Sequence, residues 1–536
     1  MHVDLEHPSL PGEFRSEVCV IGAGTAGILV AARLARAGIS VNLLEGGGLS
    51  LEERSQGLYD IQTPGCAHAG VREGRFRTFG GASTRWGGGL LPYPEDVLHP
   101  PSLLRLPNWP LALSEIEPYY EELQQIMGVD LTPFSDELLK TFRARSPFQS
   151  TAVRLRYCKT SPFNRRNLAR TLGRECLAHP RVTVFTHCNV VSVDLEKNGG
   201  AIRTVSSVNY GGVRYRFHAQ QFILSTGTIE ACRLLLASRD VCGSGVGNER
   251  DQVGRYFHDN VGLHAAEVGP EDRQRMIRAF APYMRGPTLY KARLEAAEQT
   301  RVERGWLSVG AEFPIEEPEG SDEDRVLVLL RALQRGEMHR IVHDELRHLP
   351  LTAVQIGRML IAAKVKRRRY ISNRARMMLH VDVEQRPDPE SRVRLAPERD
   401  AVGMPRAVLD WKISAEERET LQCFALELKK IFQEQGLANL KLKWESSSDA
   451  GLIHRRDDSF HMMGGLRMGT DPSSSVVDRS LLVHGVRNLR VLSCAVFPTG
   501  GSSNPTFTML ALGLRLADQV AQTGGGCLTA SGMERV

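Results

Sequence analysis

The chain has 536 residues, of which 42% are hydrophobic and 24% charged, the ordinary composition of a soluble globular protein. The net charge of +6 is small beside 68 basic and 62 acidic residues, so it gives no reason to expect a nucleic-acid partner. The ten cysteines have no CxxC, CxxCH or regular spacing, which argues against a structural zinc site, a c-type haem and a disulfide framework. The length predicts two or more domains, or one large α/β domain with an insertion.

The N-terminal segment Met1 to Glu17 is polar, contains prolines and has no apolar core, so we expect no secretory signal. No apolar run reaches the roughly 18 residues that a transmembrane helix needs. Scattered single cysteines fit a reducing compartment. We therefore predict a cytoplasmic protein without a transmembrane segment.

A nucleotide-binding unit is predicted near the N-terminus. The apolar run Val18–Ile21 is followed at once by Gly22-Ala23-Gly24-Thr25-Ala26-Gly27, and a helical pattern then continues to Gly38. The first glycine permits the tight turn, the second lets the backbone approach a pyrophosphate, and the third lets the helix pack closely on the strand. A second strand ends on Glu45, where the acid that binds a ribose hydroxyl belongs. The alternative is a glycine-rich connection in an unrelated α/β domain.

This motif does not separate NAD from FAD. It lies at the N-terminus of a long chain that has no second comparable fingerprint, which favours a tightly held flavin. A second glycine-rich loop follows from Arg75, and its candidate cofactor contacts are Gly80, Gly81, Ser83, Thr84 and Trp86. Such a loop suits a backbone that lies against a flat ligand, although a surface glycine loop is the alternative.

The middle of the chain alternates between strand and helix patterns. Residues 108–145 have a helical pattern, and residues 181–193, 201–210 and 213–225 are typical of consecutive strands. The last strand leads into a turn with Gly227 and a helix at 229–237, which predicts a return to the nucleotide-binding sheet. Residues 260–455 differ in character: helical segments at 326–333 and 354–365 precede two strand-like pieces, 377–385 and 406–413.

Two glycine-rich turns near the C-terminus contain the candidate catalytic residues. His461 precedes Met462-Met463-Gly464-Gly465, and Asn504 lies in Phe497-Pro498-Thr499-Gly500-Gly501-Ser502-Ser503-Asn504-Pro505-Thr506. A neutral imidazole suits proton abstraction near pH 7, and a fixed amide suits the orientation of a substrate hydroxyl. Together with a flavin as hydride acceptor, they predict alcohol oxidation, with a helix at 508–520 closing the segment.

Four segments in this order resemble the glucose–methanol–choline (GMC) family of FAD-dependent oxidoreductases. They are GAGTAG with Glu45, FGGASTRWGG, STGTIEACRLLLAS, and the stretch from His461 through NPTFTMLALGLRLAD. The His/Asn pair and FPTGG…NPT resemble the bacterial sugar-acting, pyranose-oxidase-like branch. The resemblance covers about half of the chain and is most specific at the C-terminal end.

The resemblance implies an α/β fold in which a Rossmann-type FAD-binding domain carries an inserted α+β substrate domain built on an antiparallel sheet. The expected boundaries are 15–95 and 175–259 for the FAD-binding domain, 96–174 for connecting helices and cover, 260–455 for the substrate domain, 456–523 for the C-terminal catalytic and FAD-binding segment, and 524–536 for a tail. It further implies His461 as catalytic base and Asn504 as the second catalytic residue. The expected cofactor contacts are Gly22, Gly24, Thr25, Ala26, Gly27, Glu45, Gly80, Gly81, Ser83, Thr84, Trp86, Val190, Val191, Gly227, Pro505 and Thr506.

Two positions depart from the family pattern. Some members attach FAD through a histidine in the glycine loop, where this chain has Arg85, so we expect non-covalent FAD. Many members carry an acid at the position of Ser493, which leaves the cofactor contact at that position open.

The predicted reaction is the FAD-dependent oxidation of CH–OH to a carbonyl on a sugar, glycoside or sugar-bearing metabolite, with the proton taken by His461 and the hydride by flavin N5. The alternatives are a non-sugar alcohol such as a sterol or polyol, or a non-catalytic flavin-binding partner subunit. The electron acceptor is oxygen or a soluble or carrier acceptor.

Each of three further sequence features allows two interpretations. The basic residues Lys364 and 366–369 follow an apolar run, which suits either an acidic membrane surface or a solvated helix end. His339 and His343 have metal-like spacing, but HExxH is absent, so we expect no metal. His258 and Asp259 are polar neighbours of the insertion point, with either a functional or a structural role.

Overall fold

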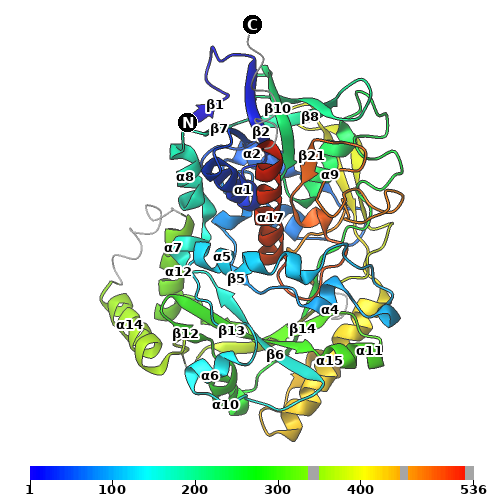
Figure 1. Cartoon of the computed structure of the whole chain (residues 1–536). Coiled ribbons are helices and arrows are strands. Elements are labelled where there is room, and N and C mark those ends of the chain that lie inside the picture. Colours follow the sequence, from blue (N-terminus) through cyan, green and yellow to red (C-terminus); the bar gives the residue numbers. More distant parts are fainter. Residues whose placement is uncertain (336–348, 373, 447–456, 526–536) are drawn as a thin grey trace.

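The structure is a computed structural model, and it describes residues 1–335, 349–372, 374–446 and 457–525. His339, His343 and the end of the predicted tail lie outside the described residues. Two large sheets divide the molecule, one in the upper and one in the lower half of Figure 1, with the C-terminal helix between them.

The upper sheet is the nucleotide-binding sheet, with strand order β1-β7-β3-β2-β10-β9-β8 and β21 paired with β10. Its first five strands and β21 run parallel, whereas β10, β9 and β8 form an antiparallel meander. Its strands are β1 (His2–Asp4), β2 (Glu13–Ile21), β3 (Val41–Leu44), β7 (Val182–Thr186), β8 (Asn189–Leu195), β9 (Ile202–Val208), β10 (Arg214–Leu224) and β21 (Leu489–Val491). The continuous apolar ends of β2 and β3 are buried, as expected of central parallel strands covered on both faces.

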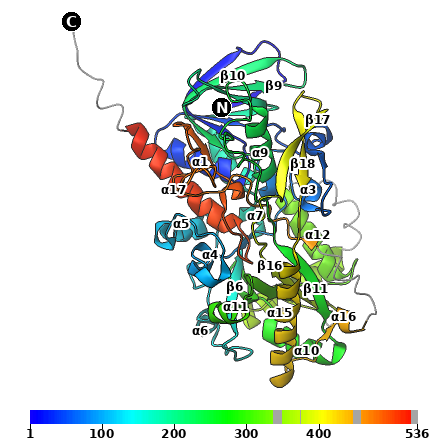
Figure 2. The ribbon, with the colours of Figure 1, turned by 90° about the vertical axis from the view of Figure 1, so that its right-hand side faces the viewer.

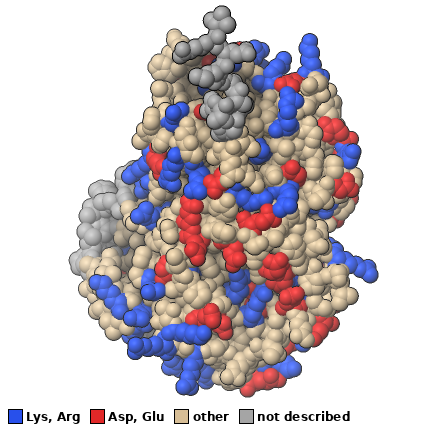
Figure 3. Space-filling model, viewed as in Figure 1, with Lys and Arg blue, Asp and Glu red and all other residues tan. Residues whose placement is uncertain are grey.

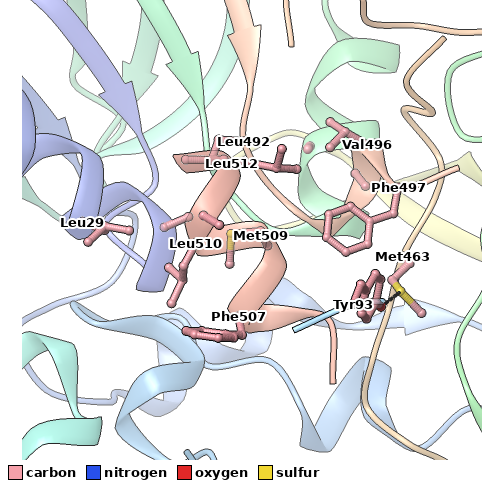
Figure 4. Packing of buried hydrophobic residues seen from close by; sticks show 14 of the residues in the cluster. Leu29, Tyr93, Met463, Leu492, Val496, Phe497, Phe507, Met509, Leu510 and Leu512 are labelled. Carbon is pink, nitrogen blue, oxygen red and sulfur yellow. Dashed lines mark hydrogen bonds between the residues drawn. The ribbon is translucent and has the colours of Figure 1, made fainter. Parts of the chain in front are cut away.

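Helices α1 (Thr25–Arg36) and α17 (Thr506–Gly525) pack against each other beside this sheet. Figure 4 shows Leu29 of α1 and Leu510 of α17 in the core between them. A Cβ at Gly513 would lie 3.2 Å from Leu492 and 3.6 Å from Val30, so the glycine lets α17 approach closely. The predicted closing helix of the chain is therefore confirmed, and its first residue lies next to Asn504 and Pro505.

The lower sheet is antiparallel, with strand order β19-β11-β16-β14-β13-β6-β5 and three short strands paired at its sides. Its strands are β5 (Gly89–Leu90), β6 (Val153–Thr160), β11 (Val261–Glu267), β12 (Tyr283–Arg285), β13 (Thr288–Ala296), β14 (Val309–Glu312), β15 (Ile315–Glu316), β16 (Arg376–Val383), β19 (Lys441–Leu442) and β20 (Asp457–Asp458). Helix α15 (Ala415–Glu434) packs on β11, β14 and β16, and Figure 2 shows it alongside this sheet.

A third, three-stranded sheet has the order β17-β18-β4 and consists of β17 (Arg392–Arg399), β18 (Pro405–Asp410) and β4 (Ile61–Gln62). It packs against α9 (Thr228–Ala237), the helix after the Gly227 turn. The remaining α-helices of the described residues are α2 (Glu53–Gln56), α3 (Gly70–Glu73), α4 (Glu95–Leu98), α5 (Pro118–Ile126), α6 (Leu138–Phe142), α7 (Phe163–Arg166), α8 (Leu172–Ala178), α10 (Pro270–Phe280), α11 (Glu298–Arg304), α12 (Asp322–Arg335), α14 (Leu349–Ile361) and α16 (Lys443–Ser446).

The chain order within the sheets differs from a simple insertion. The lower sheet takes β5 and β6 from before residue 260, whereas the β17–β18 hairpin, within 260–455, packs on α9 of the nucleotide-binding half.

The helical expectation for 108–145 is wrong in part, because two separate helices, α5 and α6, form there. Gly128, at φ +68°, follows the end of α5 in a conformation that does not continue a helix.

Within the residues that the structure describes, no helix combines the length and the apolar character needed to cross a bilayer.

Candidate active site

The glycine turn after β2 has a backbone that only glycine permits. Gly22 has φ +102°, and a Cβ there would lie 2.7 Å from the Ser225 carbonyl oxygen. A Cβ at Gly27 would lie 1.9 Å from the Gly22 carbonyl oxygen, so the third glycine of the motif lets α1 pack on the turn. A Cβ at Gly24 would meet no atom within 4 Å, because Gly24 borders an open cavity at the N-terminus of α1.

This cavity encloses about 1500 Å³, its open mouth included, and the C-terminal segment closes part of it. The predicted site residues that line it are Gly22, Gly24, Thr25, Ala26, Glu45, Gly81, Val190, Gly227, His461, Pro505 and Thr506. Gly27, Gly80, Ser83, Thr84, Trp86, Val191 and Asn504 are not among its lining residues. The structure thus brings the N-terminal turn, Gly227 and the His461 turn to one cavity.

Glu45 is buried at the end of β3. Its carboxylate accepts hydrogen bonds from the backbone N–H groups of Gly47, at 2.8 Å, and Ala23, at 3.3 Å. Burial raises the pKa of Glu45, and these two N–H donors oppose that rise. An acceptor beside an open helix N-terminus fits the ribose and diphosphate of a dinucleotide, so the residues present match the expected cofactor.

The second glycine loop lies directly against the first. A Cβ at Gly81 would lie 3.0 Å from Gly24 Cα, so this glycine permits the close approach. The polar side chains of the loop are used within it or by its neighbours. Ser83 donates to the Gly80 carbonyl, Thr84 donates to the Gly81 carbonyl, and the Trp86 indole donates to the Arg166 carbonyl. The loop therefore offers mainly its backbone to the cavity.

A charged cluster that the sequence did not reveal also lines the cavity. Arg75 and Arg233 both bind Glu230, at 3.0 and 3.1 Å, and Arg233 also binds Asp400 at 2.5 Å. Arg77 lies over the Tyr59 ring and donates to Asn189. Because these groups come from the glycine loop, α9 and the β17–β18 hairpin, only the fold brings them together.

Ser493 also lines the cavity, and its side chain accepts a hydrogen bond from the Ala495 N–H, which begins the short helical turn at Cys494–Val496. Arg85 is not a cavity-lining residue, and its guanidinium lies over the Phe76 ring.

The orientation of His461 is determined by Asn260, the residue immediately before β11. His461 Nδ1 lies 3.0 Å from Asn260 Oδ1, and the Asn260 amide nitrogen donates to the Gly501 carbonyl oxygen at 2.6 Å. Since the donor end of the amide is used at Gly501, its oxygen faces His461, and Nδ1 must carry the proton. Nε2 is then the unprotonated nitrogen of His461, which lines the cavity. Burial lowers the pKa of His461 below its ordinary value, which favours the neutral imidazole.

The turn before Asn504 is held by buried polar groups of the lower sheet. The Gly501 N–H donates to Glu384 at 3.0 Å, and the Ser502 N–H donates to the Ser308 hydroxyl at 3.1 Å. Arg293 donates to the Ser502 carbonyl, and Ser503 donates to Glu295. Pro505 and Thr506 follow at the cavity wall, and Asn504 lies beside β5, with Nδ2 3.7 Å from the Cβ position of Gly89. Asn260 thus joins the two candidate catalytic turns.

A buried charged triad supports the His461 backbone. His68 lies between two carboxylates, 3.0 Å from Asp259 and 3.1 Å from Asp458. Asp259 accepts the His461 N–H at 2.9 Å, and the backbone N–H groups of Ala69 and Gly70 hold Asp458. Burial alone would lower the pKa of His68, but the two carboxylates raise it to about 9. His68 is therefore an imidazolium at neutral pH.

A row of polar residues crosses the face of the lower sheet that contacts the Asn504 turn. Glu312 pairs with His380 across β14 and β16, and His380 pairs with His264 of β11, with ring centroids 4.7 Å apart. The register of β13 places Arg293 beside Glu312. Burial opposes ionisation of Glu312, but the nearby charges of Lys291 and Arg293 keep its pKa below the ordinary value. The face is therefore charged and polar, whereas alternate residues such as Ala311 and Val381 are buried.

The sequence did not reveal Asn260 or His68 as site residues. Asn260 follows the polar pair His258–Asp259, which was a signal for the region but not for this residue. His258 is buried and its Nδ1 lies 2.9 Å from the Tyr256 carbonyl oxygen. Burial lowers its pKa to about 4, so its imidazole is neutral at pH 7. His68 has no glycine motif or metal-like spacing around it.

Comparisons with known proteins match two parts of the chain to families of oxidoreductases. Residues 17–256 match the family described as FAD dependent oxidoreductase, and residues 387–513 match the family described as GMC oxidoreductase. The fructose dehydrogenase large subunit of Gluconobacter japonicus is 22% identical, over 94% of this chain and 97% of its own length. The 6'''-hydroxyparomomycin C oxidase of Streptomyces lividus is also 22% identical, over 94% of this chain and 91% of its own length.

Among solved structures, pyridoxine 4-oxidase from Mesorbium loti superposes with a TM-score of 0.59 at 16% identity, covering 94% of this chain and 99% of that chain. At this identity the likeness shows the fold alone.

The cavity, its glycine turns and the first family match define an FAD-dependent oxidoreductase. The C-terminal segment, which contains the His461 and Asn504 turns, matches the GMC oxidoreductase family over residues 387–513, in agreement with the resemblance of the sequence to that family.

Proposed function

We propose that this enzyme oxidises a CH–OH group of a sugar, glycoside or sugar-bearing metabolite, with His461 as the base. The observation that supports this most directly is the hydrogen-bond chain from His461 through Asn260 to Gly501. It holds the proton on Nδ1 and leaves Nε2 free to take a proton from a substrate hydroxyl. When bound, FAD supplies the acceptor for the hydride that leaves the same carbon.

Asn504 has the role of orienting the substrate oxygen in this proposal. Its turn is fixed at three consecutive positions by Glu384, Ser308 and Glu295, so the amide is presented by a rigid backbone. A pre-oriented donor of this kind contributes on the order of 10²–10³ in rate where charge develops on oxygen. The cofactor contacts proposed above for the N-terminal turn, Glu45 and the glycine loop form part of the same proposal.

Two observations favour a polar, hydroxyl-rich substrate. Both relatives named above are described as acting on fructose or on a hydroxyparomomycin, a sugar and a sugar-bearing compound. In this chain, Glu312, His380 and His264 line up on the sheet face next to the Asn504 turn. An ionised carboxylate and imidazoles suit hydroxyl groups, and they disfavour a large apolar ring system.

Anaerobic bleaching of the bound flavin by a panel of sugars, glycosides, sterols and simple polyols tests the proposal. We expect bleaching by one or more sugars or glycosides and its loss in His461→Ala. His484→Ala is the matched control, because His484 is a histidine of the same segment that does not line the cavity. Equal bleaching by wild type and His461→Ala would refute the base assignment, and bleaching by sterols alone would refute the substrate class.

Non-covalent binding of FAD belongs to this proposal, because Arg85 cannot form the bond that a histidine makes at that position. Acid precipitation should therefore release all of the flavin into the supernatant. We further propose a cytoplasmic enzyme whose electron acceptor is oxygen or a separate carrier. Comparison of turnover in air with turnover on an artificial acceptor distinguishes these two acceptors.

A further inference from the structure

A pair of helices at the lower left of Figure 1 presents apolar side chains to solvent. Helix α12 is followed by α14, which continues as a wider helical turn at Ala362–Lys366. Helix α14 packs on α12. Gln355 of α14 is only 2% exposed, so the buried side of this helix includes a polar residue.

The outward side of α14 is apolar. Ile361 is 62% exposed and Val365 is 75% exposed, and three neighbours are exposed as well: Val354, Ile356 and Leu360. Val354, Ile361 and Val365 recur at intervals of seven and four residues on one stripe of the helix, and Ile356 and Leu360, four residues apart, form a second stripe on its exposed side. Large exposed apolar residues elsewhere in the described chain are scattered, whereas these five lie within residues 354–365 of one helical segment, and α12, on which α14 packs, also exposes Leu333. Clustered exposure of this kind marks an interaction surface.

Cations surround the apolar face and acids are absent from it. Residues 349–372 contain six lysines and arginines and no aspartate or glutamate. Arg358, Lys364, Lys366 and Arg367 are exposed, and Figure 3 shows blue side chains gathered on this lobe. Arg368 is not available, because it donates to the Ala281 carbonyl and lies over the Tyr283 ring.

A solvated helix end does not account for this arrangement, since such a helix would turn Ile361 and Leu360 inward and Gln355 outward. Apolar side chains flanked by cations match the boundary of an anionic bilayer, where the apolar groups enter the acyl region and the cations meet phosphates. We propose that this face, consisting of the five apolar residues and the four exposed cations named above, docks the protein on the surface of an anionic phospholipid membrane.

The proposal concerns surface attachment and is independent of the proposed oxidation. Co-sedimentation of the flavin-loaded protein with vesicles tests it, using phosphatidylcholine alone and phosphatidylcholine mixed with phosphatidylglycerol. We expect binding to the mixed vesicles only, weakened by salt.

Two variants separate the contributions of charge and apolar insertion. One changes Arg358, Lys364, Lys366 and Arg367 to Gln, and the other combines Ile361→Ser with Val365→Ser. Each should weaken vesicle binding by about tenfold or more, because each cation and each inserted side chain contributes to the partition. Flavin content and melting temperature should stay unchanged in both, since these side chains are exposed.

Matched controls lie at the opposite end of the molecule. Lys197, Arg203, Arg214 and Arg181 are exposed cations of the nucleotide-binding half, and Val213 and Val241 are exposed apolar residues there. Changing these cations to Gln, or Val213 and Val241 to Ser, should leave vesicle binding intact. Absence of binding to the mixed vesicles, or equal loss in the control variants, would overturn the proposal. Concentration-dependent self-association abolished by Ile361→Ser would overturn it in favour of a second copy of the chain.

Discussion

Replacement of His68 by Gln tests whether the buried imidazolium stabilises the site. His68 lies 3.0 and 3.1 Å from two carboxylates, and they raise its pKa from 6.5 to about 9 despite burial. Because the folded-state pKa is the higher one, the stabilisation is complete below about pH 6.5 and is lost as the pH rises through about 9.

The size of the effect follows from this shift. A difference of this size in pKa corresponds to about 3 kcal/mol of unfolding free energy. For a chain of this length, that free energy shifts the melting temperature by roughly 3 °C. We therefore expect the wild type to melt about 3 °C above His68→Gln near pH 6.5, and the two melting curves to converge above about pH 9.

Far-UV circular dichroism of the flavin-loaded proteins across this pH range measures the difference. The control is His218→Gln, because His218 is a histidine that meets a half-exposed acid, Glu13, away from the cavity. Parallel pH dependence of the wild type and His68→Gln would refute the argument, since it would mean that His68 titrates identically in the folded and unfolded chain.

Four further predictions concern turnover. Burial holds the pKa of His461 below its ordinary value, and the base must be neutral to act. The acidic limb of the kcat/KM pH profile should therefore lie below about pH 6.5. A limb above that pH would contradict the assignment of His461 as the base. Asn260→Leu removes the acceptor that holds the proton on His461 Nδ1 and should lower kcat on the order of 10²-fold with little change in KM, as measured by steady-state kinetics. Asn260→Asp keeps an acceptor and adds a negative charge, so it should retain more activity and move the acidic limb to higher pH; an unmoved limb would count against the contact. Glu312→Gln should raise KM for the best sugar by about tenfold with a smaller effect on kcat, because a charged acceptor for substrate hydroxyls is lost; an unchanged KM would place the substrate elsewhere.

The nucleotide-binding turn was predictable because its conformation depends on the residues themselves. Gly22 requires a positive φ, and Gly27 leaves no space for a Cβ, so the spacing of these glycines specifies the local structure. The same local logic placed His461 in its turn and predicted the closing helix at 508–520, which the structure extends to Thr506–Gly525. The catalytic role of His461 stays a prediction.

Asn260 and His68 were not predictable because their roles depend on distant parts of the chain. Asn260 contacts His461 and Gly501, both more than 200 residues later, and His68 meets Asp259 and Asp458. No local pattern marks such partners. The break in the helix predicted at 108–145 was also hidden from the sequence pattern. The helical periodicity continues past Gly128, but the backbone conformation of Gly128 does not continue a helix.

The order of strands in the two large sheets has a consequence for synthesis of the chain. The lower sheet uses β5 and β6, the upper sheet then takes β7 to β10, and the lower sheet resumes with β11. The upper sheet is complete only when β21 pairs with β10, close to the end of the chain. Neither half can therefore finish folding on the ribosome before nearly the whole protein has emerged, so no single cut should yield either half as an autonomous fragment.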